Sequence, residues 1–167
     1  DILHLEDPEF GRVALSRGSH IAMELVPTIG TEEWQAALLG TLLSCCLLQR
    51  RRFPLHAASL LQDGAVGALC GPSGAGKSTL VSALARRGNL LVSDDVTPLE
   101  LDGAGRVRAS AGRREVKLDS PSARALGFEP NQLGVVPGTP EKRFVESLRD
   151  GQTVPAGPWP LAAVYLM

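Results

Sequence analysis

Short apolar runs separated by turn residues open the chain. Three such runs within residues 2–26 are broken by Pro8, Gly11 and Gly18. Apolar runs of this length between proline and glycine residues predict a meander of short strands. We therefore expect residues 1–30 to form a strand-rich N-terminal segment.

A helical pattern follows this segment. Thr31 is a suitable N-cap, and the carboxylates of Glu32 and Glu33 favour the positive end of a helix dipole. Residues 34–48 then carry apolar side chains on most helical faces. This distribution predicts a deeply packed helix.

Two strands and a second helix come next. Residues 53–61 and 65–70 are rich in β-compatible side chains, and Asp63-Gly64 between them is a strong hairpin signal. Residues 77–87 have the apolar spacing of a helix that packs on a sheet, and Gly88 ends them. The pattern thus predicts a hairpin followed directly by a helix.

The second half of the chain adds further strands to a mixed sheet. The apolar run 90–92 predicts a buried strand that is the parallel partner of 65–70 in a right-handed βαβ unit. The unbroken apolar run 161–166 predicts a central strand. The fold class is therefore α/β. The other predicted elements are a hairpin over 99–108 and a short helix over 121–126 capped by Ser120.

Composition narrows the class of protein. The chain has 167 residues, about the size of one domain. A net charge of −1 and an aromatic content of 4% argue against nucleic acid partners. The longest apolar run, Ala36–Leu48, is too short to cross a bilayer, and three cysteines without framework spacing are typical of reduced thiols. We expect a cytoplasmic protein without membrane partners. The chain starts at Asp1, not at a methionine, and stops at Met167 directly after the strand-like run 161–166. We therefore expect it to be a piece of a longer protein.

Residues 71–78 carry the strongest chemical signal. Their sequence, Gly-Pro-Ser-Gly-Ala-Gly-Lys-Ser, fits the phosphate-binding loop G-x4-G-K-[S/T] at every fixed position, between a predicted strand and a predicted helix. Gly74 and Gly76 permit backbone angles that direct N–H groups at an anion. Lys77 supplies a charge to the terminal phosphates, and the Ser78 hydroxyl can bind Mg²⁺. ATP and Mg²⁺ are the cofactors that this pattern implies. The residues expected to contact the nucleotide are Gly71, Ser73, Gly74, Ala75, Gly76, Lys77, Ser78, Thr79 and Arg143.

A pair of carboxylates follows the strand at 90–92. Asp94 and Asp95 are placed at the carboxyl edge of the sheet, where α/β folds bind ligands. One can hold the metal while the other accepts a proton from an attacking hydroxyl. The sequence leaves open which aspartate has which role, and our starting set of metal ligands is Ser78 and Asp95. His56 lies at the hairpin beside the loop strand, from which it can reach the carboxylates.

Together these segments resemble a known family. Leu55–Leu60, Gly71–Thr79 and Leu90–Val96 are similar to the catalytic domain of HPr kinase/phosphorylase, and more closely to HPr-kinase-related serine kinases of ribosomal (lasso) peptide biosynthesis. The resemblance covers about residues 36–167 and is strong over 55–96.

The resemblance implies a fold, an activity and a set of residues. The fold is the mixed-sheet phosphate-loop domain that this family shares with phosphoenolpyruvate carboxykinase, here over residues 31–167. The activity is Mg²⁺-dependent transfer of the ATP γ-phosphate to a serine hydroxyl. The implied catalytic residues are Asp94, Asp95, His56 and Lys77, and two further elements that the related kinases tend to have are Lys117-Leu118 and Lys142-Arg143.

The expected acceptor is a peptide or small protein. The Glu-x-Arg-Gly-x-Gly segment of HPr kinase itself is not found after the acid pair, which favours a dedicated peptide or protein kinase. HPr kinase is a ring-like oligomer, so the resemblance also implies a homo-oligomer.

Two other functions share the same loop. One is a nucleotide-binding regulatory module, and the other is a slow NTPase with water as the acceptor. The second aspartate, which mere binding does not need, favours transfer to an acceptor.

Overall fold

The computed structural model describes residues 2–31, 34–35, 38–136, 139–145 and 154–167. The chain divides into two compact units, Asp1–Pro54 and Leu55–Met167. The expected boundary after residue 30 falls inside the first unit, because helical residues beyond it pack on the N-terminal strands.

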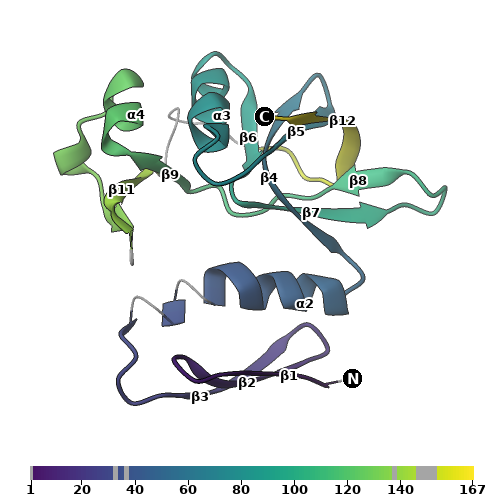
Figure 1. Ribbon diagram of the computed structural model, residues 1–167. Coiled ribbons are helices and arrows are strands. Elements are labelled where there is room, and N and C mark those ends of the chain that lie inside the picture. Colours follow the sequence, from purple (N-terminus) through teal and green to yellow (C-terminus); the bar gives the residue numbers. More distant parts are fainter. Residues whose placement is uncertain (1, 32–33, 36–37, 137–138, 146–153) are drawn as a thin grey trace. The chain divides into compact units, whose positions relative to one another are not determined.

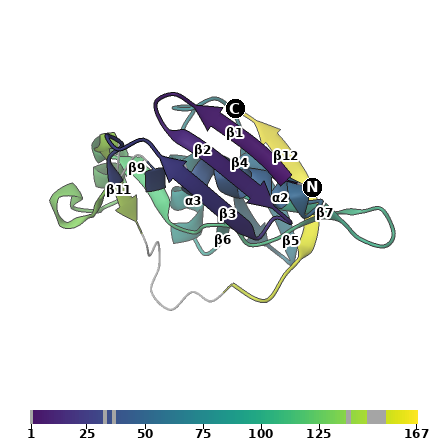
Figure 2. The same ribbon diagram turned by 90° about the horizontal axis from the view of Figure 1, so that it is seen from below.

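The N-terminal strands form the predicted meander. Strands β1 (Ile2–Asp7), β2 (Gly11–Ser16) and β3 (His20–Leu25) are antiparallel and lie side by side in that order (Figure 2). Their inward side chains alternate with outward ones, as a half-buried sheet requires. Val13 and Leu15 are the fully buried members of β2.

The helical segment of the first unit is less buried than its sequence predicts. A π-helical turn, Leu38–Leu42, continues into α2, Leu43–Gln49. Leu42 and Cys46 pack against β2, but Leu43 and Leu48 are 43% and 55% exposed. The apolar run is therefore one buried stripe with exposed leucines, not a helix packed on most faces. Glu32, Glu33 and residues 36–37 lie outside the described residues.

The second unit is built on a six-stranded mixed sheet. Its order is β5-β12-β8-β7-β4-β6, and β5 also pairs with β4 (Figure 1). Strands β5, β12, β8, β7 and β4 therefore form a closed circuit, to which β6 is attached along β4. The strands are β4 (Phe53–Gln62), β5 (Ala65–Cys70), β6 (Leu90–Ser93), β7 (Val96–Leu101), β8 (Val107–Ala109) and β12 (Trp159–Leu166).

The neighbour of β5 differs from the sequence prediction. The hairpin β4–β5 is antiparallel as expected, with Ala57 opposite Cys70. However, β6 pairs antiparallel with β4, placing Ser59 opposite Ser93. The run 90–92 is thus parallel to β5 but separated from it, because the hairpin strand occupies that edge. The parallel neighbour of β5 is β12.

Strand β12 lies between β5 and β8 in the sheet order, but these two strands pair with different parts of it. Trp159 and Pro160 pair with β8, whereas the rest of the strand pairs only with β5. Tyr165 and Leu166 are 58% and 86% exposed. The predicted run 161–166 is therefore paired on one side, although β12 as a whole has an internal place in the sheet order. Apolarity alone does not report which part of a strand each neighbour flanks.

A smaller sheet and two helices complete the second unit. Helix α3 (Lys77–Arg86) follows the glycine-rich loop, and α4 (Ser120–Ala125) follows β9. The N-cap of α4 is Asp119, whose carboxylate accepts the Ser122 N–H at 2.7 Å, and not Ser120 as expected. None of the helices in the described residues is long and apolar enough to cross a membrane. The smaller sheet has the order β10-β11-β9, from β9 (Val116–Asp119), β10 (Val135–Val136) and β11 (Thr139–Val145).

Two apolar clusters hold the second unit together. One lies between α3 and the sheets, and the other lies within the closed circuit of strands. Strand β6 contributes to both, because Leu91 joins the first cluster and its neighbour Val92 joins the second. Both residues are buried, so β6 is fixed on its two faces directly before the acid pair.

Gly112 allows one close approach that the acid pair needs. A Cβ at this position would lie 2.4 Å from the Ser93 Oγ and 2.5 Å from the Val96 carbonyl oxygen, on either side of the two aspartates. We expect Gly112→Ala to lower the free energy of unfolding by about 1–3 kcal/mol, the usual cost of overpacking. Urea denaturation measures it, with Gly103→Ala as the control because a Cβ there meets nothing within 4 Å. Equal stability of the two variants would contradict this interpretation.

Candidate active site

Loop 71–78 connects β5 to α3 in a conformation that requires glycine. Gly74 and Gly76 have φ angles of +83° and +89°, which side-chain-bearing residues rarely adopt. Gly76 is the N-cap of α3, and no side chain in the described part of the chain caps this helix. The first N–H groups of a helix have no acceptor within the helix itself. An uncapped first turn at the end of a glycine-rich loop is the arrangement that binds anions.

Lys77 is a buried cation without a carboxylate partner in the described part of the chain. The residue as a whole is only 8% exposed. The ammonium donates to the carbonyl oxygens of Gly71 at 2.8 Å and Pro72 at 3.0 Å. Two neutral acceptors compensate a buried charge poorly, so this site gains from a bound anion.

Ser78 joins the loop to the acid pair. Its hydroxyl donates to both carboxylate oxygens of Asp94, at 2.9 Å and 3.2 Å. A hydroxyl beside a carboxylate is a set of hard oxygen donors of the type that Mg²⁺ takes. This contact differs from our starting assignment, in which Asp95 accompanies Ser78.

Asp94 is buried and fixed at its backbone. It is 3% exposed, and its main-chain N–H donates to the Arg113 carbonyl at 2.7 Å. One of its carboxylate oxygens also accepts the Lys117 main-chain N–H at 3.3 Å. No cationic side chain pairs with this carboxylate among the residues that the structure describes, so the donor set fits a metal cation.

Asp95 has a different environment from its neighbour. Its φ angle is +69°, a left-handed conformation that aspartate and asparagine tolerate better than most residues. Its carbonyl accepts the Ala57 N–H at 3.2 Å, which fixes the main chain. Its side chain is 46% exposed and is paired with the Lys117 ammonium at 2.6 Å. The pair thus presents one buried and one accessible carboxylate.

The two carboxyl groups have pKa values shifted in opposite directions. Burial, and then the charge of Asp95, raise the pKa of Asp94 despite the hydrogen bond from Ser78. Burial would also raise the pKa of Asp95, but the hydrogen bond and charge of Lys117, with the charges of His56 and Lys142, lower it overall. Asp95 is therefore ionised at neutral pH. Burial makes the charged form of Asp94 less favourable, and a bound cation would stabilise that form.

His56 is placed where the sequence suggests. It is an exposed residue of β4, one position before the strand pairs with β5, and its charge acts on Asp95. The hydrogen bond from Ala57 to the Asp95 carbonyl keeps this part of β4 beside the acid pair.

One face of the antiparallel strand pair β9–β11 supplies further charged groups. In this antiparallel pair Lys142 is opposite Asp119, and Phe144 is opposite Lys117. Side chains opposite each other share a face of the sheet, so these four residues share one. Both lysines act on Asp95, one through a hydrogen bond and the other through its charge. In the sequence Lys117 belongs to the Lys117-Leu118 element of the resemblance and to a basic stretch with Arg113 and Arg114, which suits either surface charge or contact with a substrate or phosphate.

Arg143 does not lie on the face of the strand pair that carries Lys117 and Lys142. It is opposite Leu118, on the other face of the strand pair. Its guanidinium donates to the main-chain carbonyls of Pro130, Pro140 and Lys142. Arg143 therefore binds main-chain carbonyls in place of the phosphate contact that we expected. Side chains alternate along a strand, so Lys142 and not Arg143 is directed towards the acid pair.

The remaining loop residues are placed as follows. The Thr79 hydroxyl donates to the Ser122 Oγ of α4 at 3.1 Å, which joins the first turn of α3 to α4. Ser73 is exposed, and Ala75 donates its N–H to the Pro72 carbonyl at 3.2 Å. Thr79 can therefore offer an incoming nucleotide only its main chain while that contact persists.

Asp94→Asn is expected to stabilise the ligand-free protein at neutral pH. Asparagine keeps the shape of the side chain and removes a buried charge. Because the folded-state pKa of Asp94 lies above the unfolded value, ionisation destabilises the fold above that folded-state pKa, and this effect disappears once the pH falls below the unfolded value of 3.8. We expect a gain of about 1 kcal/mol at pH 8, or roughly 2–4 °C in Tm.

Thermal unfolding of wild type and Asp94→Asn from about pH 3 to pH 8 measures this difference. Asp63→Asn is the matched control, since Asp63 is a turn residue with φ of +50° that asparagine also tolerates. A stability difference between wild type and Asp94→Asn that does not change with pH would show that charge burial is not its cause.

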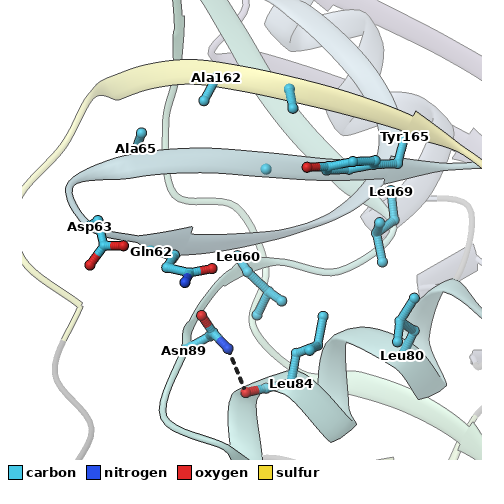
Figure 3. Close-up of a pocket in the computed structure, with 12 residues that line it drawn as sticks. Leu60, Gln62, Asp63, Ala65, Leu69, Leu80, Leu84, Asn89, Ala162 and Tyr165 are labelled. Carbon is cyan, nitrogen blue, oxygen red and sulfur yellow. Dashed lines mark hydrogen bonds between the residues drawn. The ribbon is translucent and has the colours of Figure 1, made fainter.

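A separate groove of about 450 Å³ lies between α3 and the strands β4, β5 and β12 (Figure 3). Leu60 and Leu69 from the strands and Leu80 and Leu84 from the helix line it, with Tyr165 along β12. Neither the acid pair nor residues 71–78 belong to its lining. The groove is therefore distinct from the candidate active site.

Comparison with known proteins gives little further information. No family model matches the chain, and no curated protein does. Among solved structures, the HPr(Ser) kinase/phosphatase from Coxiella burnetii is similar over 55% of this chain and 55% of its own, with 22% identity and a TM-score of 0.36. The chain therefore spans about half the length of that protein, and a likeness of this extent establishes no family.

Proposed function

We propose that this chain is an ATP- and Mg²⁺-dependent kinase that transfers the γ-phosphate to a serine hydroxyl of a peptide or small protein. The observation that carries the proposal is the difference between the environments of the two aspartates in the acid pair. Asp94 is hydrogen-bonded to the loop serine, whereas its neighbour Asp95 is half exposed and ionised. One carboxylate is thus available to a metal and the other to an acceptor.

Residues 71–78 would hold the triphosphate. The uncapped first turn of α3 offers main-chain N–H groups, and Lys77 offers a buried ammonium. Phosphoryl transfer depends mainly on positioning and on compensating the phosphate charge, and this loop supplies both. Bound Mg²⁺ would add further compensation, with Ser78 and Asp94 as its protein ligands.

Asp95 is the proposed general base. In the transfer a serine oxygen forms a bond to the γ-phosphorus while the bond from that phosphorus to the β-phosphate oxygen breaks, and ADP leaves. The serine proton passes to the Asp95 carboxylate, which is accessible at 46% exposure. His56 is close enough to act on Asp95 electrostatically and can assist this proton transfer.

The acceptor class rests on the motif resemblance set out above. The related kinases act on serine in proteins and in ribosomally made peptides such as lasso precursors, so serine peptides are the first acceptors to test. A homo-oligomer stays a prediction, as does a cytoplasmic location.

The test is a transfer assay with γ-labelled ATP, Mg²⁺ and a panel of serine-containing peptides. We expect labelled peptide with the wild-type protein, and none with Asp94→Asn or when Mg²⁺ is chelated. Released phosphate without labelled peptide would support an NTPase instead. Tight ATP binding without turnover would support a regulatory binding module.

A further inference from the structure

Lys117 contacts both members of the acid pair through different groups. Its main-chain N–H donates to Asp94, and its ammonium donates to Asp95 at 2.6 Å. This residue belongs to β9, outside the loop and acid-pair motifs. Its side chain is only 28% exposed, so its ammonium is held within the site.

The main chain of Lys117 lies next to the place proposed for the phosphates. One carboxylate oxygen of Asp94 accepts both the Ser78 hydroxyl, at 3.2 Å, and the Lys117 N–H, at 3.3 Å. This one oxygen therefore connects the main chain of β9 to the first turn of α3 through its two hydrogen bonds. A lysine side chain is a flexible four-carbon stem, so the ammonium can turn from Asp95 towards this turn without movement of the strand.

The proposed reaction removes the present partner of this ammonium. When the serine oxygen bonds to the γ-phosphorus and its proton passes to Asp95, that carboxylate becomes neutral and no longer balances the charge of Lys117. At the same time negative charge develops on the transferring phosphoryl group and on the ADP oxygen that leaves. An ammonium that already contacts the terminal phosphate in the bound state, and that loses its attraction to Asp95 completely as this charge forms, stabilises the transition state more than the ground state.

From these contacts we infer that Lys117 is a further catalytic residue, whose ammonium exchanges Asp95 for the terminal phosphate of the bound triphosphate. The inference rests on the proposed function and adds a residue to it. The loop lysine shows the same behaviour in the ligand-free protein, since Lys77 also uses neighbouring acceptors of the site itself. The two ammonium groups would contact the phosphates from α3 and from β9.

The test compares the affinities of ATP and ADP, because only ATP carries the terminal phosphate. For Lys117→Met we expect the preference for ATP over ADP to fall about tenfold, the value of one charge-assisted hydrogen bond, with the ADP affinity unchanged. Transfer to peptide at saturating ATP should fall about 10²-fold, as for loss of one preorganised donor. Lys117→Arg should restore the nucleotide preference in part.

Arg114→Met is the matched control, since it removes an exposed cation three positions earlier in the chain. It should leave both nucleotide affinities unchanged. Isothermal titration calorimetry with each nucleotide in the presence of Mg²⁺ measures the ratio, and Lys117→Gln provides a second charge-removing variant should Lys117→Met fold poorly.

Three results would overturn the inference in different ways. If Lys117→Met keeps the wild-type preference for ATP and the wild-type rate, Lys117 is only a structural partner of Asp95 and the proposed function stands. If the wild-type protein binds neither nucleotide, the proposed function fails, and the role of Lys117 fails with it. A loss of ATP and ADP affinity by the same factor would also contradict a contact with the terminal phosphate.

Discussion

Asp95→Asn is expected to lower the rate of phosphoryl transfer by about 10²–10⁴-fold, the usual contribution of a general base. The affinity for ATP with Mg²⁺ should change by less than about threefold, because charge and hydrogen bonds at the loop are preserved. Asparagine cannot accept the serine proton at neutral pH. It can still accept a hydrogen bond from Lys117 and adopt the φ of +69°, so we expect the variant to fold as the wild type does.

Single-turnover kinetics with labelled ATP, together with nucleotide titration, separates these two effects. Asp63→Asn serves again as the control, because it is the same substitution at another left-handed aspartate. A variant that transfers phosphate at the wild-type rate would show that Asp95 is not the base. Parallel loss of binding and transfer would instead place Asp95 among the groups that hold the nucleotide.

Lys77→Met is expected to weaken ATP binding by about 10²-fold. Among the residues that the structure describes, the acceptors of the buried ammonium are the carbonyls of Gly71 and Pro72, so little opposes its transfer to a phosphate. Two charge-assisted hydrogen bonds contribute about 3 kcal/mol or more, which corresponds to that factor. Methionine has a similar length and keeps the buried stem packed.

Equilibrium titration with a fluorescent ATP analogue measures this loss. Lys142→Met is the matched variant, since Lys142 acts on Asp95 only through its charge and lies on β11. We expect a change of less than about threefold there, in line with a screened charge contact. If both variants bind equally well, the loop lysine has no special role in anion binding.

Local patterns were sufficient to predict the strand and helix on either side of loop 71–78 and the strand that precedes the acid pair. Loop 71–78 depends on glycines that permit positive φ angles and on a strand and helix that flank it directly. Asp94 and Asp95 follow the buried strand β6, whose unbroken apolar run is visible in the sequence. These features are set by short-range geometry, so the structure reproduces them.

Long-range contacts could not be predicted in the same way. The choice of Asp94 and not Asp95 as the partner of Ser78 depends on the left-handed turn at Asp95. The choice of Lys142 over Arg143 depends on the register of β11 against β9, in which Arg143 is opposite Leu118. A shift of one residue would exchange these two cations, and the sequence of either strand alone does not fix it.

Strand placement failed for a related reason. The apolar run at β6 predicts a buried strand, but it does not reveal that β4 lies between β6 and β5. The run at β12 predicts a strand, but not that its first two residues, Trp159 and Pro160, pair with β8 while the residues from Leu161 onward pair with β5. In both cases the unknown quantity was the identity of the neighbour, which depends on the whole sheet.

Two segments distant in sequence hold the main chain of the acid pair through hydrogen bonds. The Arg113 carbonyl accepts the Asp94 N–H, and the Ala57 N–H donates to the Asp95 carbonyl. A peptide cut to residues 71–96 would contain every motif of the nucleotide site yet neither of these anchors. Such a fragment would lack the preorganisation that makes its carboxylates useful. Grafting the site onto another scaffold would therefore require transplanting β4 and the turn before β9 as well, because these distant segments hold the aspartates in place.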